Sequence, residues 1–65
     1  MKIRLNDTPT EVQSATLADV LAELGYGDAK VATAVNGDFV PVALREDTTL
    51  SPGDRIEVVA PRQGG

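Results

Sequence analysis

Cysteine, histidine and tryptophan are all absent from the 65-residue chain. Without cysteine the chain has neither a disulfide framework nor a thiolate metal site, so its stability must come from packing alone. Histidine is the side chain most often used as a general base near neutral pH, and it is the commonest ligand of transition metals. Its absence argues against most hydrolytic and metal-dependent chemistry.

The chain is too short for a second domain or for a deep enclosed site. A domain of this size buries only about 60% of the surface of its unfolded chain. A ligand pocket of roughly 300–1,000 Å³ would displace most of so small a core. Hydrophobic residues make up 42% of the chain and charged residues 25%, which is the balance of a folded domain. We therefore expect a binding or carrier module rather than an enzyme.

Basic charge is in the minority, and long apolar runs are missing. Six lysines and arginines against ten acidic residues give a net charge of -4. This charge repels phosphate backbones and anionic lipid, so we expect neither nucleic acid nor a membrane as a partner. No run approaches the roughly 18 apolar residues of a membrane span, and the start of the chain does not resemble a secretory signal. We expect a cytoplasmic protein that is a monomer when alone.

One amphipathic helix is the clearest element in the sequence. Four apolar residues recur at the helical spacing i, i+3, i+4 and i+7, namely Leu17, Val20, Leu21 and Leu24. The helix begins after Thr16, an N-cap with Asp19 three residues on, and Gly25 is expected to end it as a C′ residue. The apolar face of this helix must pack on a sheet.

Alternating apolar and polar residues predict strands at both ends of the chain. Residues 2–6 form the first strand, and residues 10–13 return after a turn at residues 6–9 to make a hairpin. The turn at residues 51–54 precedes a last strand over residues 56–60. The first and last strands are the natural central pair of the sheet, because both are apolar on one side.

A second strand pair lies in the middle of the chain. Residues 31–35 form a strand, and Asn36-Gly37 can adopt the positive φ angles of a type I′ turn before residues 38–40 return. Pro41 has no N–H to donate, so this returning strand lies at an edge or ends there. Residues 42–50 show no sustained period and are predicted to be a loop with about one helical turn.

These elements predict one α+β domain over residues 1–60. Its mixed sheet of about four to five strands packs on one helix in two layers, an arrangement that resembles the ubiquitin-like β-grasp. Phe39 and Tyr26 are the only aromatic residues, and either could anchor a partner. Burial in the core is the better interpretation for Phe39.

The chain closes with a short tail, residues 61–65, that ends in two glycines. Pro61 cannot extend a strand ladder and the glycines do not hold a fixed conformation, so we expect the tail to be flexible. Because Gly64 and Gly65 have no Cβ, the tail could thread a narrow channel in a partner enzyme and present its carboxylate there.

A terminal carboxylate needs activation before it reacts as an electrophile. With an ordinary pKa of about 3.3–3.7 it is ionised at neutral pH. Adenylation by ATP would convert it into a mixed anhydride with a good leaving group, which a sulfur or amine nucleophile can attack. The sequence has no glycine-rich phosphate loop, so ATP and Mg²⁺ would be used by a partner and not bound by this chain.

Three runs of the sequence resemble one known family. They are AVNGDFVP at residues 34–41, LSPGD followed by IEVV within residues 50–59, and QGG at residues 63–65. With the helix pattern and the short length, they resemble the ThiS family of β-grasp sulfur carriers of thiamine biosynthesis. The turn residues within these runs, Asn36, Gly37, Gly53 and Asp54, are interpreted as setting turns rather than touching a partner.

This resemblance implies a site in the tail and a set of partners. Gly65 would be adenylated by a ThiF-type adenylyltransferase, converted to a thiocarboxylate with sulfur from a persulfide donor, and presented to thiazole synthase. Gly64 and Gln63 would lie in the channel of the partner. The resemblance implies no catalytic residue, metal ligand or cofactor site on the chain itself.

Three other functions fit the same tail. A Gly-Gly sulfur carrier for molybdopterin or cysteine synthesis would share the fold, which cannot separate these recipients. A ubiquitin-like modifier would conjugate to lysines, and a non-covalent interaction domain would carry its glycines incidentally. The short length and the pattern over residues 36–41 favour the thiamine branch.

Overall fold

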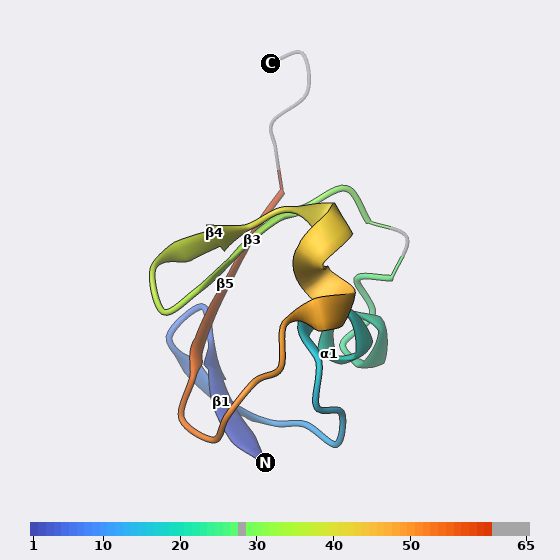
Figure 1. Cartoon of the computed structure of the whole chain (residues 1–65). Coiled ribbons are helices and arrows are strands. Elements are labelled where there is room, and N and C mark those ends of the chain that lie inside the picture. Colours follow the sequence, from blue (N-terminus) through green and yellow to red (C-terminus); the bar gives the residue numbers. More distant parts are fainter. Residues whose placement is uncertain (28, 61–65) are drawn as a thin grey trace.

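A five-stranded mixed sheet carries one α-helix on one face (Figure 1). The structure is a computed structural model that describes residues 1–27 and 29–60, so the predicted tail, residues 61–65, lies outside the described residues. The elements are β1 (Lys2–Leu5), β2 (Thr8–Glu11), α1 (Leu17–Glu23), β3 (Ala32–Val35), β4 (Asp38–Val40), the 3₁₀-helix η1 (Val42–Asp47) and β5 (Arg55–Val59).

The strand order is β2-β1-β5-β3-β4. β1 and β5 pair in parallel inside the sheet, whereas every other neighbouring pair is antiparallel. The first and last strands are therefore adjacent and internal, as the sequence predicts. The α+β class, the mixed sheet and the single helix of a β-grasp are confirmed.

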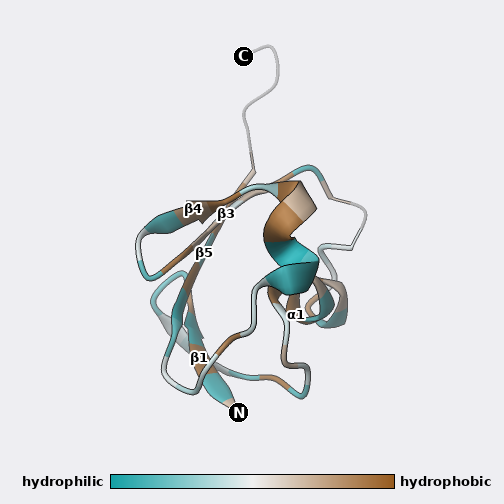
Figure 2. Ribbon diagram, viewed as in Figure 1, coloured by the Kyte–Doolittle hydropathy of each residue, from teal (hydrophilic) through white to brown (hydrophobic). Residues whose placement is uncertain are grey.

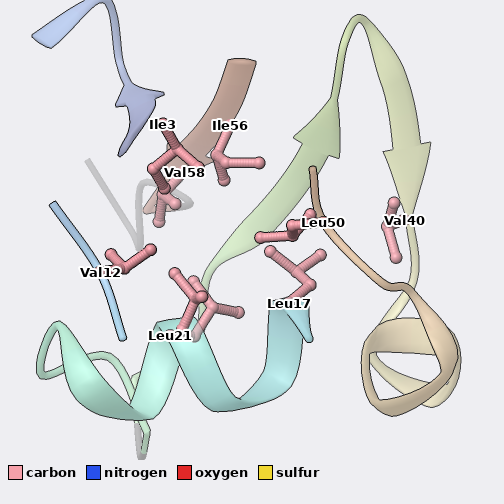
Figure 3. Packing of buried hydrophobic residues seen from close by; sticks show 9 residues of the cluster. Ile3, Val12, Leu17, Leu21, Val40, Leu50, Ile56 and Val58 are labelled. Atoms are coloured by element: carbon pink, nitrogen blue, oxygen red, sulfur yellow. The ribbon is translucent and has the colours of Figure 1, made fainter. Parts of the chain in front are cut away.

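The buried core of the described residues is formed by side chains from the sheet, from α1 and from two connecting segments. Figure 3 shows side chains from the sheet and from α1 pointing toward one another in the space between them. The buried apolar residues are Ile3, Val12, Leu17, Val20, Leu21, Val40, Leu50, Ile56 and Val58. Fully burying each such side chain contributes roughly 1.5–3 kcal/mol, which is the main stabilising term available to this cysteine-free chain.

Capping interactions fix both ends of α1 where the sequence predicts them. The hydroxyl oxygen of Thr16 accepts a hydrogen bond from the backbone N–H of Asp19 at 3.2 Å. At the other end Gly25 has a φ of 93°, and the N–H of Tyr26 donates to the carbonyl of Leu21 at 2.7 Å. With the Gly25 N–H donating to the Ala22 carbonyl at 3.2 Å, this is a Schellman motif.

Two-residue turns set the register of both hairpins. Asn36 and Gly37 have φ angles of 52° and 89°, which confirms the predicted type I′ turn. In the first hairpin only Asn6 and Asp7 form the turn, with φ angles of 47° and 69°. The prediction of a turn over residues 6–9 was therefore too long, because β2 begins at Thr8.

Pro9 lies within β2 without breaking it. β2 is an edge strand, and its alternate pairs with β1 are hydrogen-bonded. The backbone bonds of Met1 with Val12 mark one hydrogen-bonded pair, which makes the Arg4 and Pro9 pair a non-hydrogen-bonded one. The missing N–H of the proline would point away from the sheet, so its absence costs no ladder bond.

The segment between β4 and β5 is more ordered than predicted. Residues 42–47 form the six-residue 3₁₀-helix η1, where the sequence predicts about one helical turn. Arg45 ties η1 to β3, because its Nε donates to the Thr33 hydroxyl at 3.1 Å and its Nη2 donates to the Val31 carbonyl at 2.6 Å. The Thr33 hydroxyl in turn donates to the Val40 carbonyl at 2.8 Å. None of the helices in the described residues has the length and apolar character needed to cross a bilayer.

Candidate functional site

The structure positions the strand that leads to the predicted site. Gly65, Gly64 and Gln63 themselves lie outside the described residues. β5 runs between β1 and β3 and ends at Val59, one residue before Ala60, where the description stops (Figure 1). The candidate site is therefore built from the end of β5 and the surface around it.

The C-terminal half of β5 is held on both sides. On the β3 side Val59 pairs with Ala32, and Val58 pairs with Thr33. On the β1 side the Asn6 side chain makes two hydrogen bonds to Val58. Its Oδ1 accepts from the Val58 N–H at 2.9 Å and its Nδ2 donates to the Val58 carbonyl at 3.1 Å. β5 is therefore anchored up to its last two residues, Val58 and Val59.

The turn before β5 holds the start of the strand. Gly53 has a φ of 89° and the Asp54 N–H donates to the Ser51 carbonyl at 3.0 Å, which is a type II turn with proline at its first central position. The Asp54 carboxylate accepts from the Ser51 N–H at 2.8 Å and from Asn36 Nδ2 at 3.1 Å. The Oδ1 of Asn36 accepts from the Arg55 N–H at 2.9 Å.

These bonds agree with the interpretation of Asn36, Gly37, Gly53 and Asp54 as turn residues. The two turns that the sequence singles out are joined to each other by the Asn36 and Asp54 side chains. The contact of Asn6 with β5 is a feature of the candidate site that the sequence did not predict. Asparagine tolerates a positive φ, and this property indicated a turn at Asn6. Its hydrogen bonds to Val58, 52 residues away, could not be predicted from the neighbouring sequence.

Two large apolar side chains are exposed on the outer face of the sheet, one at the end of β5 and one on β4. Val59 is 60% exposed and Phe39 on β4 is 69% exposed. Ala32 and Ala34 of β3 lie between them in register, because Ala32 pairs with Val59 and Ala34 pairs with Phe39. An exposed apolar surface of this kind is typical of a protein contact.

The prediction that Phe39 packs in the core was wrong. Alternate residues of a strand point to opposite faces, and Val40 occupies the core-facing position of β4. The type I′ turn at Asn36-Gly37 fixes the register, so β4 cannot shift by one residue to bury Phe39 instead. Tyr26, the other aromatic residue, is partly buried and packs against the core beyond the end of α1.

The described residues hold no group of three or more acidic, histidine or cysteine side chains that could bind a metal ion. Among the carboxylates that the structure describes, Glu23 accepts the most hydrogen bonds. Its pKa is lowered because the Gln13 N–H, the Ser14 hydroxyl and the Ser14 N–H all donate to it. Its partners lie in the connection between β2 and α1, so it acts on the fold and not on the end of β5.

The chain matches one protein family along almost its whole length. The model of the ThiS family matches residues 3–65. The sulfur carrier protein ThiS of Thermus thermophilus is 38% identical over 61 residues, which cover 94% of this chain and 95% of that protein.

Solved structures of similar shape come from Geobacter metallireducens. The crystal structure of its thiamine biosynthesis protein ThiS superposes with a TM-score of 0.84 at 26% identity, covering 100% of both chains. The solution structure of a thiamine biosynthesis protein from the same organism superposes with a TM-score of 0.78 at 25% identity, covering 100% of this chain and 88% of the other.

Proposed function

The chain belongs to the ThiS family, and from that premise we propose that it is a sulfur carrier of thiamine biosynthesis whose reactive group is the carboxylate of Gly65. The observation that carries the proposal is the reach of the family match, which runs through the tail to residue 65. A match confined to the β-grasp body would have supported the fold alone, because one fold serves many functions.

The chemistry of the carrier follows from the state of a terminal carboxylate. It is ionised at neutral pH and resists nucleophilic attack. A ThiF-type adenylyltransferase would activate it: a carboxylate oxygen attacks the α-phosphorus of Mg·ATP, and pyrophosphate leaves. A persulfide sulfur then attacks the acyl carbon and AMP leaves. Cleavage of the sulfur–sulfur bond by a thiol leaves the thiocarboxylate on Gly65.

The folded domain supports this role because it holds the strand that leads to the tail. Residues 61–65 come after β5, whose last two residues are held by pairing with β3 and by hydrogen bonds to the Asn6 side chain. Five residues in fully extended form span at most about 17 Å, which is the greatest depth at which they could present the Gly65 carboxylate inside a partner. The lack of a Cβ at Gly64 and Gly65 lets the backbone pass through a channel too narrow for larger residues.

The partners supply the catalytic groups in this proposal. ATP and Mg²⁺ belong to the adenylyltransferase, a persulfide provides the sulfur, and thiazole synthase receives it. The chain contributes position and a carrier carboxylate, and Gln63 and Gly64 would contact the walls of the channel. Carriers for molybdopterin or cysteine synthesis would share every step except the last, so the identity of the acceptor enzyme separates them.

Removal of Gly65 tests the proposed reactive group. We expect the shortened chain to melt at the same temperature as the full chain, because the buried core cluster is made by residues within 3–58. Pyrophosphate release in the presence of a ThiF-type enzyme and Mg·ATP should fall to the background rate. Lys2→Gln, an exposed change on β1, is the matched control and should keep full activity. Undiminished pyrophosphate release from the shortened chain would contradict the assignment of Gly65.

A further inference from the structure

A groove lies at the same end of the molecule as the end of β5. It has a volume of about 390 Å³ and is lined by Lys30, Val31, Ala32, Phe39, Val42 and Arg45; we call it the Phe39 groove. Its walls come from the segment that enters β3, from β4 and from η1. Figure 2 shows hydrophobic stretches on β4 and on the first part of η1 near the point where the chain leaves β5.

The apolar side chains of the groove are displayed to solvent. Phe39 and Val42 are each 69% exposed, and both line the groove. Isolated apolar side chains on a surface need no explanation, but two large ones that share one groove expose a continuous apolar area. The fixed register of β4 keeps Phe39 outward, so the fold does not provide internal cover for it.

The charged side chains of the groove are both cationic. Lys30 and Arg45 line it, and no carboxylate is among its described lining residues, although the chain carries a net charge of -4. Within residues 1–27 and 29–60 the single ion pair joins the Met1 amine to Glu11, so neither cation is paired with a described carboxylate. The two charged side chains that line the groove in the described residues are thus opposite in sign to the net charge of the chain.

Arg45 is also held in place before any partner arrives. Its Nε and Nη2 atoms donate to Thr33 and Val31, which fixes the plane of the guanidinium group. A guanidinium has five N–H donors, so others are left for an incoming carboxylate. Because its position is already fixed, less side-chain entropy is lost on binding than for a mobile arginine.

We infer that the Phe39 groove docks a segment of the activating enzyme that places an apolar side chain against Phe39 and Val42 and a carboxylate beside Lys30 and Arg45. This inference rests on the proposed function. The position of the groove supports the inference, because Ala32 lines the groove and pairs with Val59 at the end of β5. A partner that receives the tail after β5 would therefore lie beside the groove. A second copy of the chain fits less well, because two molecules of charge -4 repel each other.

Steady-state adenylation kinetics with the full chain and a ThiF-type enzyme test this inference. Phe39→Ser should raise the KM for the carrier about tenfold with little change in kcat, as loss of an interface aromatic does. Lys30→Glu should raise KM several-fold, and its KM should respond less to added salt than that of the unaltered chain. Melting temperatures of both variants should stay close to the original, since both side chains are exposed.

Two control variants carry the same chemical changes at other exposed positions. Leu44→Ser removes an apolar side chain that is 52% exposed on η1 and does not line the groove, and Lys2→Glu reverses a charge on β1. Both should keep the original KM. The inference is overturned if groove and control variants behave alike while the unaltered chain is adenylated normally.

The remaining outcomes are equally decisive. A Phe39-dependent dimer in light scattering would make a second copy the occupant and overturn the assignment to the enzyme. Normal adenylation with a loss confined to sulfur transfer would assign the groove to thiazole synthase instead. An unaltered chain that is not adenylated at all contradicts the proposed function itself, and with it the inference that rests on it.

Discussion

Glu23 shows how one exposed side chain stabilises a connection in this small fold. It lies in the last turn of α1, where the helix dipole disfavours negative charge, yet it accepts hydrogen bonds from the Gln13 N–H at 2.9 Å and from the Ser14 N–H and hydroxyl at 3.0 and 2.9 Å. These donors hold the segment between β2 and α1 against the helix. They also lower the pKa of Glu23 below its ordinary value of 4.5.

Replacing Glu23 with Gln should lower the stability of the fold near neutral pH. Since the folded-state pKa is depressed, the carboxylate contributes stability that is fully present above about pH 4.5 and is lost as the pH falls through the folded pKa. The difference in unfolding free energy between the two proteins should therefore shrink below pH 4.5. Urea titrations at several pH values measure it.

Glu46→Gln is the matched control for that experiment. The Glu46 carboxylate accepts no hydrogen bond from any part of the chain that the structure describes, and it too is exposed on a helix. Its replacement should leave the pH dependence of stability almost unchanged. A Glu23 variant as stable as the original at pH 7 would show that the hydrogen bonds to Gln13 and Ser14 add nothing.

Single residues were the hardest scale to predict from sequence. The prediction for Phe39 was wrong because a three-residue strand is too short for its sequence to show which side chains face the core. The orientation of the strand depends on where the preceding turn begins. The role of Asn6 depends on its contact with Val58, which exists only after the sheet has formed. The residues next to Phe39 and Asn6 in the sequence therefore do not predict either the exposure of Phe39 or the contact of Asn6.

Among the elements, α1 gives the most direct test of the core. Leu21 is 3% exposed and faces the sheet with Leu17 and Val20. Leu21→Ala should lower the free energy of unfolding by about 2–5 kcal/mol, because it removes buried apolar surface and leaves a cavity. Ala22→Ser on the exposed side of the same helix should change it by less than about 0.5 kcal/mol. Equal unfolding midpoints in urea for the two variants would refute the helix orientation.

Elements with a strong local signal were predicted well. The spacing of leucine and valine gave α1 its position to within one residue, since the predicted apolar run ends at Leu24 and the helix ends at Glu23. The Asn36-Gly37 and Pro52-Gly53 turns required positive φ angles that glycine supplies at low cost. The predicted boundaries were wrong where that signal was weaker, as at the Asn6-Asp7 turn and at η1.

At the scale of the whole molecule, the charge is unevenly placed. The chain is acidic overall, but the Phe39 groove beside the end of β5 carries cations. A partner that enters the groove meets apolar side chains and the two cationic side chains Lys30 and Arg45. Association should therefore depend on orientation more than on net charge.

The site proposed at Gly65 stays a prediction from sequence, because residues 61–65 lie outside the described residues. That prediction rests on the Gly-Gly sequence and on the family resemblance, and it requires no folded geometry. The surface that would guide a partner could not be predicted, because β3, β4 and η1 come together only in the folded chain. The cytoplasmic location stays a prediction.

The intact mass of the chain after incubation with Mg·ATP, a ThiF-type adenylyltransferase and a persulfide donor tests the central claim most directly. The account predicts that one oxygen is replaced by one sulfur, and that fragmentation places the change on Gly65. An unchanged mass under conditions that load another ThiS protein would contradict it, and so would a ladder of protein adducts, which would identify a modifier instead.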